Sequence, residues 1–322
     1  MTAVIGFMLQ QQNSRKARQN TKSGSQSKDR GTMIKLLALD LDGTTLDSHG
    51  AVADSTRSAI ASAENAGVLV TIATGRRFRD ARPLGLELRL NAPLITHNGA
   101  LLKFADSGET AAFSTLTTET AVALMEIGRS VDSHPMVSTD PLGEGLLLFD
   151  RTSLETPALE SHIRWSDRLH GAVGRNGLKM VDNIALAVSE AVVVHISFSG
   201  AVLAMESLAK RLSDALPERI KVLKTVYPRR DFTLLDILPP DASKGHGVAK
   251  LASLSSITRD EVMAIGDNFN DLDMLEYAGT PVVMGNADQS LLERREFYTT
   301  LTNDEGGVAA AIERFILNKE NI

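Results

Sequence analysis

A run of apolar residues that leads into two aspartates constrains this chain more than any other feature. Leu36-Leu37-Ala38-Leu39 is followed by Asp40 and Asp42, and Gly43 comes next. A short continuous apolar run is typical of a strand that is buried on both faces of a parallel sheet. In open α/β sheets, ligands bind at the carboxyl ends of the strands. We therefore expect Asp40 and Asp42 to lie at the mouth of a binding site.

The aspartate pair itself suggests a cation site. Two neighbouring carboxylates repel each other unless a cation or a shared proton relieves the repulsion. Mg²⁺ prefers oxygen ligands and often binds one or two carboxylates together with a substrate phosphate. A turn whose aspartates cap the next element is the alternative interpretation of this stretch taken alone. The rest of the chain decides between the two.

Composition excludes several classes of protein. The 322 residues favour two domains, and 43% hydrophobic with 23% charged residues is ordinary for a globular protein. A net charge of −6 argues against a nucleic-acid or anionic-membrane partner. The absence of cysteine excludes disulfides and thiolate chemistry and is compatible with a reducing cytoplasm. No apolar run is long enough for a membrane span, so we expect a cytoplasmic protein, with its oligomeric state left open.

Residues 1–32 differ in composition from the rest of the chain. They are rich in Ser, Gln, Lys, Arg and Asn, and their short apolar stretch precedes the basic residues instead of following them. That order is the reverse of a secretory signal, and the low hydrophobicity predicts a disordered tail. Met33 stands directly before the first strand, and a start of translation at Met33 is the hypothesis that this position suggests.

Strands and helices alternate before residue 99 and after residue 238. Apolar strands are predicted at 36–39, 68–73, 93–96, 261–265 and 281–285, and helices at 54–66, 244–253 and 306–316. This alternation indicates βαβ units and a parallel sheet. We therefore predict an α/β fold with a doubly wound, Rossmann-like core built from residues 33–98 and 239–322.

Hairpins and helices are mixed in residues 99–238. Hairpins are predicted from 101–104 with 112–114 and from 221–227 with 232–238. Single strands are predicted at 145–149 and 184–198, and helices at 118–131, near 153–169 and at 201–216. Such a mixture indicates an antiparallel α+β unit. We predict that it forms a separate domain inserted into the core.

Polar groups follow the predicted core strands at several points. Thr74-Gly75 ends the second strand, Asp267 to Asp271 follow the fourth, and Lys244 begins a helix with Ser243 as a candidate N-cap. Taken singly, Thr74-Gly75 is typical of a turn and Lys244 of an exposed lysine. Together, four carboxylates, a lysine and a hydroxyl indicate phosphoryl chemistry with Mg²⁺.

These segments resemble the four ordered motifs of the haloacid dehalogenase-like superfamily. The motifs are Asp40-Leu41-Asp42-Gly43-Thr44, Ala73-Thr74-Gly75-Arg76, Lys244 and Gly266-Asp267-Asn268-Phe269-Asn270-Asp271. The insert between the second and third motifs resembles the α+β cap of the Cof-type sugar-phosphatase subgroup. The resemblance covers residues 33–317 and leaves out the N-terminal tail.

The resemblance implies a phosphatase and a role for each motif residue. Asp40 would be the nucleophile that forms an aspartyl-phosphate, and Asp42 the acid and base. Mg²⁺ would be bound by Asp40, the Asp42 carbonyl and Asp267, with Asn268 contributing and Asp271 in the metal shell or orienting Lys244. Phosphate would be bound by the N–H groups of Leu41 and Gly75 and by the side chains of Thr74, Lys244 and Asn270.

Two other functions fit the same motifs. A phosphomutase uses the same aspartate pair but returns the phosphoryl group to a sugar, and a phosphoacceptor or sensor would be phosphorylated without turnover. The expected partner is a small phosphorylated metabolite, either a sugar phosphate or a flavin-type phosphate. Candidate leaving-group contacts in the insert are Ser138-Thr139-Asp140 and Arg229-Arg230. His97 and His246 are expected to be structural.

Overall fold

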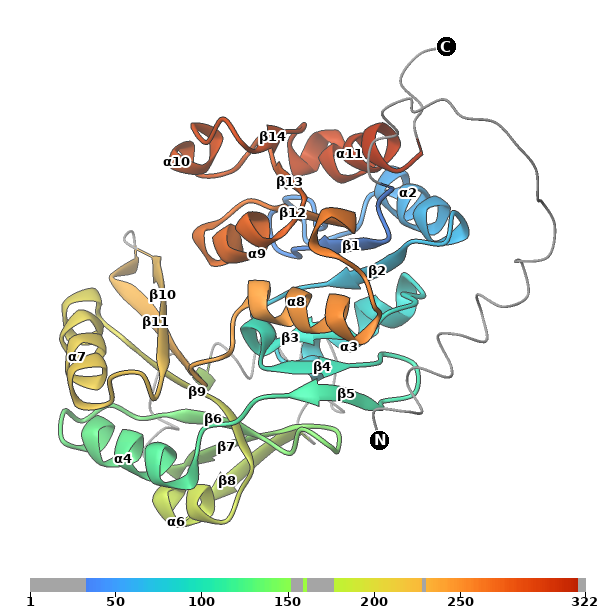
Figure 1. The fold of residues 1–322 in the computed structure, drawn as a ribbon. Helices are drawn as coiled ribbons and strands as arrows, with labels where there is room; N and C mark the ends of the chain where they lie inside the picture. The colour runs from blue at the N-terminus through green and yellow to red at the C-terminus, as the bar shows by residue number, and fades with distance from the viewer. Residues whose placement is uncertain (1–32, 152–158, 161–176, 228–229, 318–322) are drawn as a thin grey trace, which may run out of the picture. The chain divides into compact units, whose positions relative to one another are not determined.

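The computed structural model describes residues 33–151, 159–160, 177–227 and 230–317 (Figure 1). The predicted disordered tail, most of the predicted helix near 153–169, and Arg229 lie outside these residues. The chain divides into two compact units. Unit 1 holds the described residues up to Ala73, Leu90–Ala92 and those from Val248 onward. Unit 2 holds Thr74–Arg89 and the described part of Pro93–Gly247.

Unit 1 is built on a five-stranded parallel sheet. Its order is β14-β13-β12-β1-β2, with bounds Tyr298–Thr299, Thr280–Val283, Val262–Gly266, Leu36–Leu39 and Leu69–Ile72. β1 lies between two neighbours and its four residues are completely buried, as the apolar run predicts. The predicted parallel core is confirmed. β14 was not predicted, because a two-residue strand with exposed side chains leaves no apolar pattern.

Helices connect the strands of unit 1 in the manner of a doubly wound, Rossmann-like fold. They are α2 (Asp54–Asn65), α9 (Leu272–Tyr277), α10 (Gln289–Leu292) and α11 (Gly307–Phe315). α2 packs against α11, and each presents small and branched apolar side chains to the core. Among the described residues, no helix combines the length and the apolar character that crossing a membrane requires.

Unit 2 contains a small antiparallel sheet that corrects one prediction. β3 (Leu94–Thr96), β4 (Leu101–Lys103) and β5 (Thr110–Phe113) pair in that order, after helix α3 (Phe78–Glu87). The predicted hairpin is therefore confirmed, but the expectation that 93–96 joins the parallel sheet is wrong. The physical reason is the turn η1 (His97–Gly99), in which all three residues have positive φ and return the chain alongside β3.

A six-stranded sheet forms the rest of unit 2. Its order is β10-β11-β9-β6-β7-β8, with bounds Lys221–Tyr227, Phe232–Leu238, Val193–Gly200, Met136–Thr139, Leu146–Asp150 and Leu178–Val181. All pairs are antiparallel except β7 with β8. Helices α4 (Thr118–Arg129), α6 (Ile184–Ser189) and α7 (Val202–Ala215) share one apolar core with the sheet, which includes Ile196, Phe198, Leu208 and Leu235. The α+β character of the insert is thus confirmed.

The predicted strand at 184–198 is wrong in its first half. Ile184–Ser189 forms helix α6, and only Val193 onward forms β9. The helix begins there because the Asn183 side chain accepts a hydrogen bond from the N–H of Leu186 at 3.1 Å, which caps its first turn. The apolar run resembles a buried strand in composition, and the single capping residue decides the outcome.

Helix α8 (Lys244–Leu254) begins in unit 2 and continues into unit 1. The Ser243 hydroxyl accepts a hydrogen bond from the N–H of His246 at 3.1 Å, so the predicted N-cap is confirmed. The division into units runs differently from the predicted core of 33–98 and 239–322 and the predicted insert of 99–238. Residues 74–89 and 93–98 group with the insert by their internal packing.

Candidate functional site

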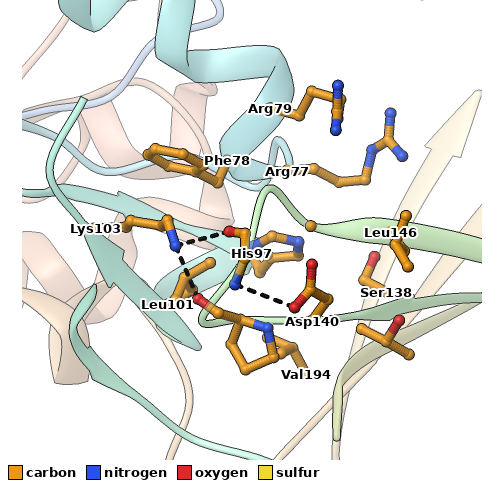
Figure 2. Close-up of a pocket in the computed structure, with 14 residues that line it drawn as sticks. Arg77, Phe78, Arg79, His97, Leu101, Lys103, Ser138, Asp140, Leu146 and Val194 are labelled. Carbon is orange, nitrogen blue, oxygen red and sulfur yellow. Dashed lines mark hydrogen bonds between the residues drawn. The ribbon is translucent and has the colours of Figure 1, made fainter. Parts of the chain in front are cut away.

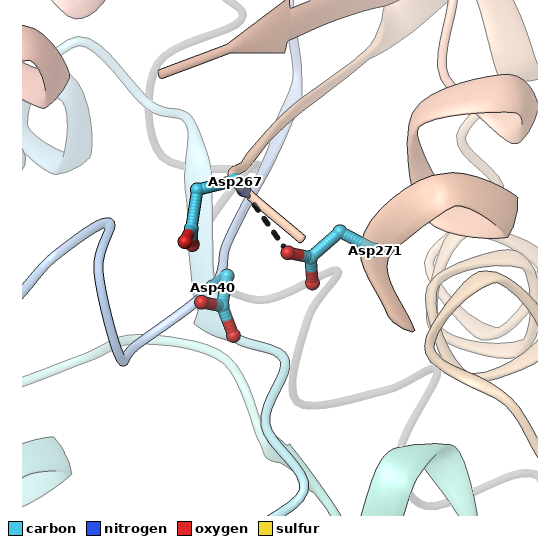
Figure 3. A group of neighbouring side chains, drawn as sticks. All are labelled: Asp40, Asp267 and Asp271. Carbon is cyan, nitrogen blue, oxygen red and sulfur yellow. Dashed lines mark hydrogen bonds between the residues drawn. The ribbon is translucent and has the colours of Figure 1, made fainter. Parts of the chain in front are cut away.

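Three carboxylates meet at the carboxyl edge of the parallel sheet in unit 1. Asp40 follows β1, Asp267 follows the neighbouring strand β12, and Asp271 ends the short helix η6 (Phe269–Asp271). The N–H of Asp40 donates to the carbonyl oxygen of Ile265 at 2.9 Å, which fixes the two strand ends side by side. One carboxylate oxygen from each aspartate lies within 4.8 Å of the other two (Figure 3). The predicted cluster therefore exists for these three residues.

Asp271 shapes the loop that carries Asp267. It is completely buried, and its Oδ2 accepts hydrogen bonds from the N–H groups of Asp267 at 3.1 Å and Asn268 at 3.0 Å. The Asn268 side chain in turn accepts from the N–H of Phe269 at 2.7 Å, so it is tied to its own loop. A Cβ at Gly266 would lie 2.6 Å from the Cβ of Asp271, and only glycine leaves room for that aspartate.

The loop after β1 holds Asp267 from the other side. Gly43 has φ +85°, and a Cβ there would lie 2.5 Å from Oδ2 of Asp267. The Thr44 hydroxyl donates to Oδ1 of Asp267 at 2.8 Å, and the Thr45 hydroxyl donates to the carbonyl oxygen of Asp40 at 2.6 Å. Sequence reasoning gave neither threonine a role. Thr44 could have been found from its place inside the first motif.

A second residue that sequence reasoning missed is Asn286. Its side-chain amide donates to the carbonyl oxygen of Gly43 at 2.9 Å, and its Oδ1 accepts from the N–H of Asn303 at 2.9 Å. Asn286 therefore braces the loop after β1 against a loop more than two hundred residues later in the chain. No pattern in the sequence marks it, because an isolated asparagine after a strand is ordinary loop composition.

The donor set of the cluster suits a hard divalent cation. Asp40 and Asp271 are 5% and 0% exposed, and their oxygens lie close to those of Asp267. Buried carboxylates this close together are costly unless a positive charge compensates them. All the donors are oxygens, which Mg²⁺ prefers. The residues present thus fit the predicted metal.

The other predicted ligands of this region are not among the three grouped carboxylates. The side chain of Asp42 is exposed, and its backbone forms an isolated bridge with Leu46. Asn268 and Asn270 are exposed as well, while Leu41 is buried. The carboxylate of Asp42 is not one of the three that group together.

The remaining predicted phosphate-binding residues belong to unit 2. Thr74 is buried, and its hydroxyl accepts from the N–H of Arg76 at 3.1 Å. Gly75 lies close to Asn98, since a Cβ would approach its Oδ1 to 3.1 Å. Lys244 is the buried first residue of α8. Thr74 directly follows Ala73, whose N–H donates to the carbonyl oxygen of Leu39 at 2.8 Å within unit 1.

The two histidines expected to be structural have defined surroundings. His97 is buried, and burial holds its pKa well below 6.5, with the charges of His195 and Arg77 acting in the same direction. His246 lies at the start of α8, where its Nδ1 is 2.8 Å from the hydroxyl of the capping Ser243. Both arrangements are those of residues that hold local structure.

Comparison with known proteins connects this geometry to a family. A family model described as haloacid dehalogenase-like hydrolase matches residues 37–312. YxeH of Bacillus subtilis is 31% identical over 290 residues, covering 89% of this chain and 100% of that protein. The 5-amino-6-(5-phospho-D-ribitylamino)uracil phosphatase YwtE of the same organism is 30% identical over 297 residues, covering 88% and 98%.

A solved structure shares the fold. A haloacid dehalogenase-like hydrolase from Bacteroides thetaiotaomicron superimposes with a TM-score of 0.71 at 27% identity, covering 87% of this chain and 99% of that one. The family match begins within strand β1, at residue 37, and contains all four sequence motifs and the insert between them. The similarity therefore extends over both units and does not rest on the acidic cluster alone.

Proposed function

Because this chain belongs to the haloacid dehalogenase-like hydrolase family, in its Cof-type subgroup, we propose that it is a Mg²⁺-dependent phosphatase of small phosphomonoesters. The reaction proceeds through an aspartyl-phosphate on Asp40. Phosphatase activity follows from the family and its named relatives. The observation that carries the finer proposal is the meeting of Asp40, Asp267 and Asp271 at the ends of two adjacent parallel strands.

Asp40 acts as the nucleophile and Asp42 as the general acid and base. A carboxylate oxygen of Asp40 attacks the phosphorus, the bond from phosphorus to the ester oxygen breaks, and Asp42 gives its proton to the departing alcohol. Asp42 then takes a proton from the water that attacks the same phosphorus, which releases inorganic phosphate and restores Asp40. The exposed side chain of Asp42 and the anchored backbone of Asp40 support this division.

Mg²⁺ would be held by Asp40, Asp267 and the backbone carbonyl of Asp42, and Asn268 and Asp271 would complete its surroundings. When bound, it neutralises the charge that a carboxylate and a phosphate bring together. The position of Asp267 is fixed by its neighbours, because its N–H donates to Asp271 and its carboxylate accepts from the Thr44 hydroxyl.

The phosphate is bound by the N–H groups of Leu41 and Gly75 and by three side chains, those of Thr74, Lys244 and Asn270. Hydrogen-bond donors and a positive charge around the transferred group stabilise the charge that develops on its oxygens. The substrate is a small phosphorylated metabolite, a sugar phosphate or a related compound. YwtE, which is named for a phosphorylated ribitylamino compound, supports that class.

Release of inorganic phosphate from p-nitrophenyl phosphate tests the proposal. We expect turnover with Mg²⁺ and its loss in EDTA. Asp40→Asn should lower kcat by about 10³-fold or more, because it removes the nucleophile with little change in shape. Asp54→Asn, which changes a fully exposed aspartate of the same unit, is the matched control and should keep wild-type turnover. Full activity in EDTA or in Asp40→Asn would overturn the mechanism.

Asp42→Asn separates hydrolysis from its alternatives. Loss of the base should slow attack by water more than phosphorylation of Asp40, so phosphorylated enzyme should accumulate and be visible in intact-protein mass spectrometry. Rapid return of the phosphoryl group to added sugar by the wild type, with little free phosphate, would instead identify a phosphomutase. Stoichiometric labelling without turnover would identify a phosphoacceptor.

A further inference from the structure

Unit 2 contains a pocket next to the segment that carries Thr74 and Gly75 (Figure 2). Its lining includes Arg77 from the start of α3, His97 from η1, Lys103 from β4, and Ser138 to Asp140 from the end of β6. Within this unit, the carbonyl oxygens of Thr74 and Arg76 accept the N–H groups of Asn98 and His97, each at 3.0 Å. The pocket wall and the proposed phosphate-binding segment are therefore one hydrogen-bonded structure.

Lys103 is the unusual member of the pocket because it is 2% exposed. Its ammonium lies within hydrogen-bond distance of three consecutive carbonyl oxygens, those of residues 141, 142 and 143, at 3.1, 3.2 and 2.8 Å. It also donates to the hydroxyl of Thr110 at 2.9 Å. Burial lowers the pKa of Lys103, while the charges of Asp140 and Glu144 oppose that shift. Lys103 thus fixes the loop between β6 and β7 through hydrogen bonds to the main chain of that loop.

That loop presents Asp140 in a defined orientation. Asp140 has φ +62°, and its Oδ1 accepts the N–H of Gly143 at 3.1 Å. A Cβ at Gly143 would lie 2.2 Å from Oδ2 of Asp140, so the tight turn needs glycine there. Beside it, the hydroxyl oxygen of Ser138 is buried and has no hydrogen-bond partner among the residues that the structure describes. An unpartnered buried hydroxyl lining a pocket requires a ligand or water.

Asp140 and Ser138 determine what can bind on their side of the pocket, which Arg77 and Arg79 also line. Arg77 is paired with Asp80 through two hydrogen bonds, at 2.8 and 3.2 Å, so its charge is already compensated. Asp140 is an acceptor only when ionised, and it recognises hydroxyl or N–H donors. Ser138 can both donate and accept. The pair therefore suits a group that carries several hydrogen-bond donors of its own.

We propose that Asp140 and Ser138 recognise the alcohol that leaves from the phosphomonoester, and that Lys103 is the positioning residue that holds Asp140 in place. The inference rests on the proposed phosphatase function and adds the chemical requirement on the substrate. The leaving alcohol carries further hydroxyl or N–H donors. A site built to bind such a donor rejects an analogue that lacks it, because its buried polar groups are then left unpaired.

The test compares two kinds of substrate. One is the best substrate within a panel of polyol and aldose phosphates, and the other is p-nitrophenyl phosphate, whose leaving group has no hydroxyl beyond the ester oxygen. Asp140→Asn should lower the ratio of their kcat/KM values by about tenfold or more, because an amide N–H replaces an acceptor. The matched control is Asp132→Asn, at the other end of β6, where the aspartate is exposed and also has positive φ. It should leave the ratio unchanged.

Lys103→Met tests positioning separately. It removes the ammonium while keeping a long apolar side chain. We expect the same fall in the ratio of kcat/KM values, expressed mainly in KM for the polyol or aldose phosphate.

Ser138→Ala should lower the same ratio. Its control is Ser133→Ala, because the Ser133 hydroxyl is likewise buried without a partner among the described residues. Equal losses on both substrates in these variants and in Asp140→Asn would overturn the inference.

Calorimetric binding to Asp40→Asn keeps this test independent of turnover. The polyol or aldose phosphate should bind the Asp40→Asn protein at least about tenfold more tightly than it binds the Asp40→Asn, Asp140→Asn double variant. Equal affinities would overturn the role of Asp140. Absence of hydrolysis by the wild type, combined with this affinity difference, would instead overturn the proposed function and leave the recognition site standing.

Discussion

At the scale of single residues, the site depends on groups that hold the acidic residues in place. Asp267 is held by Asp271 through its N–H and by Thr44 through its carboxylate. The spacing of apolar and acidic residues was sufficient to predict the aspartates, because strand ends and carboxylates leave a pattern. It could not predict Asn286 or Lys103, because their roles depend on a loop distant in sequence from each of them.

His97 gives a prediction at this scale. Burial holds its pKa well below 6.5, so the folded protein keeps it neutral while the unfolded chain takes up a proton below that pH. The unfolded state then binds more protons, and stability falls as the pH is lowered from 7.5 to 5.5. Asparagine tolerates the left-handed backbone at this position. Over that pH interval, the free energy of unfolding of His97→Asn should fall by about 1 kcal/mol less than that of the wild type.

The measurement is urea denaturation at both pH values. The groups that face His97 from neighbouring elements, Arg77 and His195, are left in place, so the difference reports the substituted ring. His49→Asn, in which the side chain is exposed, serves as the control and should follow the wild type. An equal loss of stability in wild type and His97→Asn would contradict the assignment.

At the scale of secondary-structure elements, apolar patterns predicted which residues form strands. The starts of the helices depended on single capping residues. The strands on either side of β1 follow directly from their β-branched runs. The apolar run of residues 184–198 did not predict its structure correctly, because Asn183 caps the first turn of helix α6 in the first half of the run. The sheet of β3 was also mispredicted, because His97 and Asn98 adopt a left-handed turn that few non-glycine residues take.

Helix α8 tests the importance of capping. Ser243→Ala removes the hydroxyl that accepts the N–H of His246, and we expect a loss of about 1 kcal/mol in the free energy of unfolding. Chemical denaturation followed by circular dichroism measures it. Ser253→Ala lies on the exposed side of the same helix and should be neutral or slightly stabilising. A similar change in both variants would show that the cap contributes little.

At the scale of the whole molecule, the order of the motifs predicted a core interrupted by an insert. The observed units divide the chain elsewhere, since Thr74–Arg89 pack with the insert. Sequence patterns show which residues form strands, but the packing partner of a helix such as α3 depends on surfaces that only the folded chain brings together.

Metal binding should stabilise the folded protein as a whole. A ligand that binds only the folded state at 100 times its Kd adds about 2.7 kcal/mol, so the unfolding temperature should rise with Mg²⁺ and fall with EDTA. Differential scanning calorimetry measures the shift. Asp267→Asn should abolish most of it, whereas Asp260→Asn, an exposed residue of the same unit, should retain it. A shift that survives in Asp267→Asn would place the metal elsewhere.

The position of β1 between β2 and β12 has a consequence for synthesis on the ribosome. Thr44 and Asp267, which are hydrogen-bonded in the finished protein, lie 223 residues apart in the chain. A nascent chain therefore carries Asp40 from the start but completes the acidic cluster only after residue 271 has emerged. Until then, one edge of β1 has no partner strand, and such an edge can pair with another chain. The aspartate that we propose as the nucleophile is therefore synthesised long before the residues that complete the acidic cluster.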